Sequence, residues 1–88
     1  MNQEGVLEAI IRHAREVVPG LADHQFRADE SLRDLGANSV DRSEIIMMTL
    51  ESLSLNMPLV EVARAENIGE LASIMHGKLQ RSAQPLPA

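Results

Sequence analysis

The sequence contains no cysteine, tryptophan or tyrosine, and Phe26 is its only aromatic residue. Because cysteine is absent, the chain has no disulfide, no thiolate nucleophile and no thiolate ligand for a metal ion. Any thiol chemistry must therefore come from a group attached to the chain. The core has to be built from aliphatic residues and methionine, which suits a small bundle of helices.

Basic residues are also few, since 8 Lys and Arg stand against 13 Asp and Glu and leave a formal net charge of −5. An acidic chain repels nucleic acids and anionic membranes, so we expect neither as a partner. No apolar run is long enough to cross a bilayer, and the N-terminus lacks the basic and apolar sections of a signal peptide. The 88 residues suffice for one domain with a modest core. We expect a cytoplasmic monomer whose partners present basic patches.

The spacing of apolar residues predicts an all-α fold, a small four-helix bundle with a short third helix and a long loop between the first and second helices. The four helices are expected from about Gln3 to Val18, from Asn38-Ser39 to about Leu53, over residues 59–63 after Pro58 in about two turns, and from Asn67 to Leu79. The domain therefore spans residues 1–79. Residues 80–88, which include Pro85 and Pro87, are expected to form a disordered tail.

The connection over residues 19–38 is rich in turn-forming residues, and Pro19-Gly20 at its start ends the first helix. Gly36 is expected to adopt a positive φ. Spaced apolar residues predict an ordered loop held over the bundle, namely Leu21, Phe26, Leu32 and Leu35.

Apolar residues of the second helix predict which side of it faces the core. The expected buried stripe consists of Val40, Ile46, Met47, Leu50 and Leu53, with Ile45 and Met48 partly exposed at its edges. The three histidines are widely spaced and suggest no metal site, so the surface is the default position for His13, His24 and His76.

The stretch from Asp34 to Asp41 places the hydroxyl of Ser39 where the loop meets an acidic helix. Short polar side chains at Asn38-Ser39 suit the first turn of a helix, because they accept hydrogen bonds from its unpaired amides. Asp41 and Glu44 lie near the positive end of the helix dipole. Taken alone, this pattern is equally compatible with a plain capping role for Ser39, although Asn38 can cap the helix and leave Ser39 free.

Over nearly its whole length the sequence resembles the acyl and peptidyl carrier proteins. The resemblance is carried by Leu35-Gly36, Ser39, Met47, Pro58 and the run from Asn67 to Leu71. It implies that Ser39 receives 4'-phosphopantetheine from coenzyme A through a phosphopantetheinyl transferase, and that acyl groups are held as thioesters on that arm. Asn38 and Val40 depart from the Asp and Leu that usually flank the modified serine.

The run from Gly36 to Glu44, with Met47-Met48 and residues 51–55, is most similar to free-standing carriers of polyketide β-branching cassettes. That likeness implies an acetyl or malonyl cargo, and as partners an acyltransferase, a decarboxylating ketosynthase and an HMG-synthase-like (hydroxymethylglutaryl-synthase-like) enzyme. The residues expected to dock partners are Asn38, Val40, Asp41, Arg42, Glu44, Ile45, Met48 and Glu51.

Other interpretations stay open. The acidic side chains of the second helix can be a merely solvated face, and Arg42 a solvated cation. The chain can serve fatty acid or nonribosomal peptide synthesis, or be an unmodified helical adaptor. A hydrolase is disfavoured, because Ser39 lies in no Gly-x-Ser-x-Gly sequence, so we expect no enzyme activity.

Overall fold

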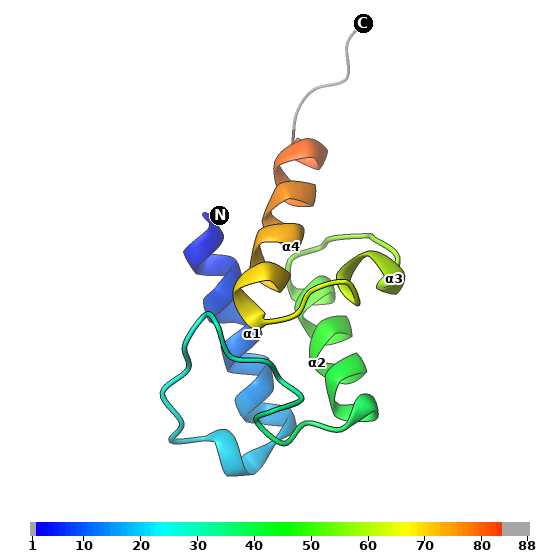
Figure 1. Ribbon diagram of the computed structural model, residues 1–88. Helices are drawn as coiled ribbons and strands as arrows, with labels where there is room; N and C mark the ends of the chain where they lie inside the picture. The colour runs from blue at the N-terminus through cyan, green and yellow to red at the C-terminus, as the bar shows by residue number, and fades with distance from the viewer. Residues whose placement is uncertain (1, 84–88) are drawn as a thin grey trace, which may run out of the picture.

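The computed structural model describes residues 2–83 as helices joined by loops. α1 packs against α2 and α4, α3 packs against α4, and a long loop crosses the lower end of the bundle (Figure 1). The elements are α1 (Gln3–Val17), the 3-10 helix η1 (Pro19–Leu21), α2 (Ser39–Ser52), α3 (Leu59–Val62) and α4 (Ile68–Ala83). The predicted all-α arrangement, with a short third helix and a long first connection, is confirmed.

A single apolar core joins the three long helices. Val6 of α1, Ile45 of α2 and Met75 of α4 have no exposed surface. Burying a side chain of this size stabilises the fold by about 1.5–3 kcal/mol. Because this core holds α2 against α1, it also fixes the position of the first residue of α2, Ser39.

The face that α2 turns to the core differs from the predicted one. Val40 and Met47 were expected inside, but their side chains are 71% and 57% exposed, whereas Ile45 is fully buried. Thr49 is also fully buried, because its hydroxyl donates to the carbonyl oxygen of Ile45 at 2.8 Å. A hydroxyl that is satisfied in this way can enter the core, so the inner stripe contains a polar residue that apolar spacing overlooks. The other expected inner residues are buried or half-buried: Ile46, Leu50 and Leu53.

The expectation that the histidines lie at the surface is wrong for His13, which is buried between α1 and α2. Its Nε2 lies 3.2 Å from the Ser52 Oγ, and its Nδ1 lies 3.4 Å from a carboxylate oxygen of Glu16. Because the Ser52 hydroxyl donates to the carbonyl of Thr49 at 3.0 Å, it accepts from His13. This polar contact links α1 to the last turn of α2. His24 and His76 are half-buried.

The long loop is ordered, as predicted, and its middle is hydrogen-bonded to the start of α4. The amides of Ile68 and Gly69 donate to the carbonyls of Glu30 at 2.9 Å and Ala28 at 2.8 Å. The approach is close, since a Cβ on Gly69 would lie 2.9 Å from the Ala28 oxygen. The loop therefore satisfies amides that have no partner within their own helix. Asn67 accepts from the Glu70 amide at 2.7 Å, which confirms the predicted cap of α4.

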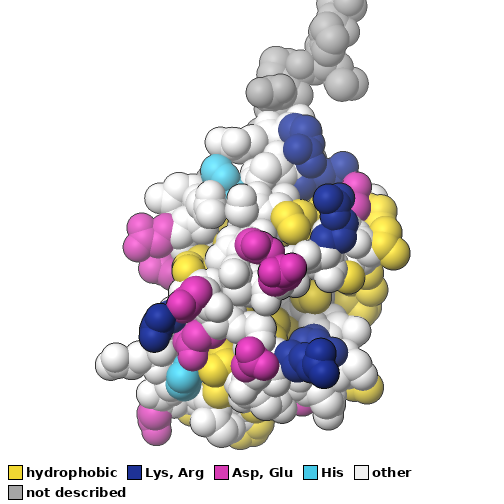
Figure 2. Space-filling model, in the orientation of Figure 1, with side chains coloured by type: hydrophobic (Ala, Val, Ile, Leu, Met, Phe, Trp, Pro, Cys, Tyr) yellow, Lys and Arg dark blue, Asp and Glu magenta, His cyan; other side chains and the backbone are white. Residues whose placement is uncertain are grey.

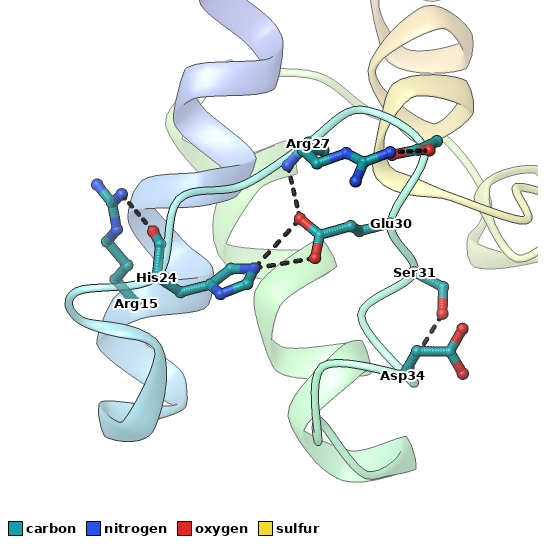
Figure 3. Close-up of polar contacts among 7 residues, drawn as sticks. Arg15, His24, Arg27, Glu30, Ser31 and Asp34 are labelled. Carbon is teal, nitrogen blue, oxygen red and sulfur yellow. Dashed lines mark hydrogen bonds and ion pairs between the residues drawn. The ribbon is translucent and has the colours of Figure 1, made fainter.

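Side chains hold the outer part of the loop together (Figure 3). The Nε2 of His24 lies 3.0 Å from a carboxylate oxygen of Glu30, whose other oxygen accepts from the Arg27 amide at 2.6 Å. Arg15 of α1 donates to the His24 carbonyl at 2.9 Å, and its guanidinium lies over the Phe26 ring. Of the four apolar residues expected to hold the loop, Leu32 belongs to the core and Phe26 packs against it, whereas Leu21 is buried and Leu35 half-buried outside that cluster.

Two helix lengths differ from the expected ones. α3 makes a single turn from Leu59 to Val62, with Pro58 just before it, instead of about two turns. α4 continues to Ala83, beyond the expected end at Leu79, because residues 80–83 contain no helix breaker and the first proline is Pro85. The rest of the predicted tail, residues 84–88, lies outside the described residues.

Candidate functional site

The loop delivers Ser39 to the start of α2 through a tight turn. Gly36 has a φ of 101°, as expected, which a residue with a side chain adopts only with strain. The amide of Ala37 then donates to the carbonyl of Leu32 at 3.0 Å, and its methyl group is buried. Ala37 thus anchors the end of the loop in the core, two residues before Ser39.

Asn38 forms the cap of α2. Its side-chain oxygen accepts from the Asp41 amide at 2.8 Å, and the Asp41 carboxylate accepts from the Asn38 amide at 3.3 Å. The two residues form a reciprocal capping box. Since Asn38 does the capping, the plain capping role that the sequence left open for Ser39 is taken by its neighbour.

Ser39 is the first residue of α2 and is exposed. Within residues 2–83, its hydroxyl takes part in no hydrogen bond, so its oxygen is free for covalent attachment. A phosphodiester there would lie at the positive end of the helix, which favours negative charge by about 0.3–1 kcal/mol. The position therefore fits a phosphate-linked arm in access and in electrostatics.

A groove of about 620 Å³ begins beside Ser39 and runs between α2, the loop and the segment around α3. Its apolar lining comes from Leu32, Ile46, Val62, Ile68 and Leu71. The charged residues that line the groove are Arg33, Asp34, Arg42 and Glu66. An arm on Ser39 would meet this groove directly.

The outward face of α2 carries a stripe of exposed residues at helical spacing. Val40, Glu44, Met47 and Glu51 follow one another at intervals of four, three and four residues, and all are exposed. Leu59 and Val60 of α3 are also exposed, at 44% and 74%. Figure 2 shows hydrophobic side chains at the right-hand edge of the molecule, where α2 and α3 lie.

Most of the residues expected to dock partners are accessible. The exposed ones are Asn38, Val40, Glu44 and Glu51, and the half-buried ones are Asp41, Arg42 and Met48. Ile45 is a correction, because its side chain is fully buried and has no surface to offer a partner. Met47 and Val60 are exposed apolar residues of the same surface that were not among the expected docking residues, Met47 because apolar spacing assigned it to the core.

Between residues 2 and 83, no three His, Asp or Glu side chains gather closely enough to hold a metal ion. No helix in that range has the length and hydropathy needed to cross a membrane.

The profile of the family described as phosphopantetheine attachment site matches residues 8–75, which include Ser39 and the groove. The chain belongs to this family of acyl carrier proteins. It therefore carries a phosphopantetheine attachment site, and its role is that of a carrier and not of an enzyme.

The carrier is 45% identical over 80 residues to the polyketide biosynthesis acyl carrier protein AcpK of Bacillus subtilis (strain 168). The alignment covers 91% of this chain and 98% of AcpK. Among solved structures, it is similar to a chain in the crystal structure of the curacin biosynthetic pathway HMG synthase in complex with acetyl donor-ACP. That match has a TM-score of 0.85 and 49% identity, and it covers 89% of the carrier and 100% of the other chain.

Proposed function

We propose that Ser39 carries the phosphopantetheine arm and that the carrier donates acetyl groups to an HMG-synthase-like enzyme of polyketide β-branching. The observation that carries this proposal is the 49% identity, over the full length of the other chain, to a chain of the HMG synthase complex with its acetyl donor carrier. The similarity to AcpK supports a polyketide pathway independently.

The local geometry supports Ser39 as the attachment point. It combines an exposed hydroxyl, a neighbour that takes over capping and a helix start that favours a phosphodiester. The terminal thiol of the arm supplies the sulfur that this cysteine-free chain lacks. Acyl groups held on it as thioesters can then be moved from one enzyme to the next.

The docking face is proposed to be the exposed stripe on α2, extended by Val60 of α3. Glu44 and Glu51 offer charge to basic partners, and Val40 and Met47 offer apolar surface on the same face of α2. Such a mixed surface suits transient contacts, because charge steers the encounter while a small apolar area keeps the complex weak.

The wider set of partners follows from the same proposal. A phosphopantetheinyl transferase attaches the arm, an acyltransferase loads malonyl, and a decarboxylating ketosynthase converts it to acetyl. All these encounters are proposed to take place in the cytoplasm with a monomeric carrier.

Loading is tested by incubating the protein with coenzyme A and a promiscuous phosphopantetheinyl transferase, followed by intact mass measurement. We expect a gain of one arm in the wild type and in Ser43→Ala, whose serine lies one turn further along α2, and no gain in Ser39→Ala. A wild-type protein that gains no mass would refute the carrier role and favour an unmodified adaptor. A gain that persists in Ser39→Ala would place the arm elsewhere.

Acetyl transfer tests the narrower assignment. The acetyl-loaded carrier is mixed with an HMG-synthase-like enzyme, and acetylation of the enzyme is followed by mass. We expect faster transfer than from an acetyl-loaded fatty acid synthase carrier. Equal rates from both carriers would remove the β-branching assignment and leave a general carrier role.

A further inference from the structure

Arg42 occupies an unusual position for a cation. It lies within the first turn of α2, and its Nη1 donates to the carbonyl of Ala37 at 2.8 Å. The side chain therefore runs back past Ser39 toward the residue at which the loop ends. This places its guanidinium beside the start of the helix.

The electrostatics of that place are unfavourable for an arginine in the unmodified chain. The start of a helix carries partial positive charge, so cations are disfavoured there and anions are favoured. Among residues 2–83, Arg42 has no carboxylate within ion-pair distance. The capping residue beside Ser39 is the uncharged Asn38, and the Asp41 carboxylate accepts a hydrogen bond from the Asn38 amide. Arg42 is therefore a cation without a paired carboxylate at the start of α2.

We propose that Arg42 binds the phosphodiester on Ser39 within the same molecule. This inference rests on the proposed attachment at Ser39. Residues three apart on a helix are neighbours, and Ser39 and Arg42 line one groove. A guanidinium has five N–H donors, and the bond to Ala37 uses only part of them. The remaining donors can reach phosphate oxygens while that bond persists.

The pairing assigns Arg42 a positioning role. The phosphodiester is held on the side of Ser39 that faces the groove, so the arm leaves the protein in a preferred direction. Arg42 is then neither a merely solvated cation nor, in the first place, a contact for partner enzymes.

The test uses the loaded protein, without any acyl transfer. Wild type, Arg42→Gln and Arg12→Gln are each converted to the loaded form and compared by 31P NMR and by 15N NMR of the arginine side chains. Arg12→Gln removes the same charge from an exposed site on α1. We expect loading to shift the Nε–H resonance of Arg42 alone, and the 31P resonance to differ from wild type only in Arg42→Gln.

Thermal unfolding gives a second readout. Loading should raise Tm more in the wild type and Arg12→Gln than in Arg42→Gln, with a difference of about 2–6 °C at low salt that shrinks as salt is added. Comparing unloaded with loaded protein within each variant cancels the effect of losing the bond to Ala37. If Arg42→Gln does not fold, a salt titration of the loaded wild type tests the pairing instead. Added salt weakens the pair, so the 31P resonance and the Arg42 Nε–H resonance should shift over the same range of salt concentration.

Loading that succeeds with no change in the 31P and Arg42 resonances, and with equal Tm gains in all variants, would overturn the pairing and leave the carrier function intact. Failure of the wild type to load would instead overturn the proposed function on which the inference rests.

Discussion

Gly69 offers the sharpest test of how the loop that presents Ser39 is held. Its amide donates to the Ala28 carbonyl, and a Cβ at this position would lie 2.9 Å from that oxygen, 3.1 Å from the Ala28 Cβ and 3.3 Å from the capping oxygen of Asn67. The nearest atom belongs to the backbone, so no side-chain rotation relieves the contact. In Gly69→Ala the loop has to move away from α4.

The size of the effect follows from competing terms. Overpacking costs typically about 1–3 kcal/mol, and a weakened backbone hydrogen bond adds about 0.5–1.5 kcal/mol. Replacing glycine by alanine within a helix also stabilises the helix by up to about 1 kcal/mol. We expect Gly69→Ala to lower the free energy of unfolding by about 1–3 kcal/mol, which lowers Tm by roughly 4–24 °C in a domain of this size.

Gly77 provides a matched control in the same helix. A Cβ there meets only the end of the Arg81 side chain, at 3.8 Å, which is an ordinary contact. Gly77→Ala should therefore raise the free energy of unfolding by about 0.5–1 kcal/mol. Thermal and urea unfolding followed by circular dichroism measures both variants. The reasoning is refuted if the two substitutions shift stability in the same direction, or if Gly69→Ala is as stable as the wild type.

Four further substitutions at three positions test α2 and its cap. Ile45→Ala should lower the free energy of unfolding in urea by about 2–5 kcal/mol, and Met47→Ala by less than about 0.5 kcal/mol, because only Ile45 is buried. A larger loss in Met47→Ala than in Ile45→Ala would show that α2 turns the predicted face to the core. Asn38→Ala should lower the free energy of unfolding by about 0.5–2 kcal/mol through loss of the cap, and an unchanged value would show that the cap contributes nothing. Met47→Glu should slow acetyl transfer at unchanged stability if the α2 stripe docks the synthase, and an unchanged rate would exclude Met47 from the docking face.

Much of the fold was predictable because local signals agreed with one another. Proline and glycine mark the end of α1, Gly36 marks the turn before Ser39, and Asn67 marks the start of α4. These features depend on backbone conformation and on neighbouring side chains, which a sequence displays directly.

The orientation of α2 was not predictable from apolar spacing. Its apolar residues run around most of the helix, so several stripes compete, and the burial of Thr49 decides among them. That burial depends on a hydrogen bond within the helix, which apolar spacing alone does not register. His13 was missed for a similar reason, because its partner Ser52 is brought to it only by the packing of α1 on α2.

At the candidate site, the sequence and the resemblance identify Ser39 and the acidic residues after it. The positions of Arg42 and of the middle of the loop could not be predicted in the same way. Both depend on contacts with backbone carbonyls, and such contacts leave no trace in residue identity apart from the glycine at position 69.

The two backbone hydrogen bonds between the loop and α4 divide the long connection into two shorter loops, each with its own entropic cost of closure. Without them, residues 19–38 would close one large loop, whereas the bonds at Ala28 and Glu30 leave two shorter spans, over residues 19–27 and 31–38. Extra residues inserted in the first span would loosen only the side near α1, because the second span closes independently on α4. The connection can therefore vary in length near its beginning and still present the serine hydroxyl at the same place.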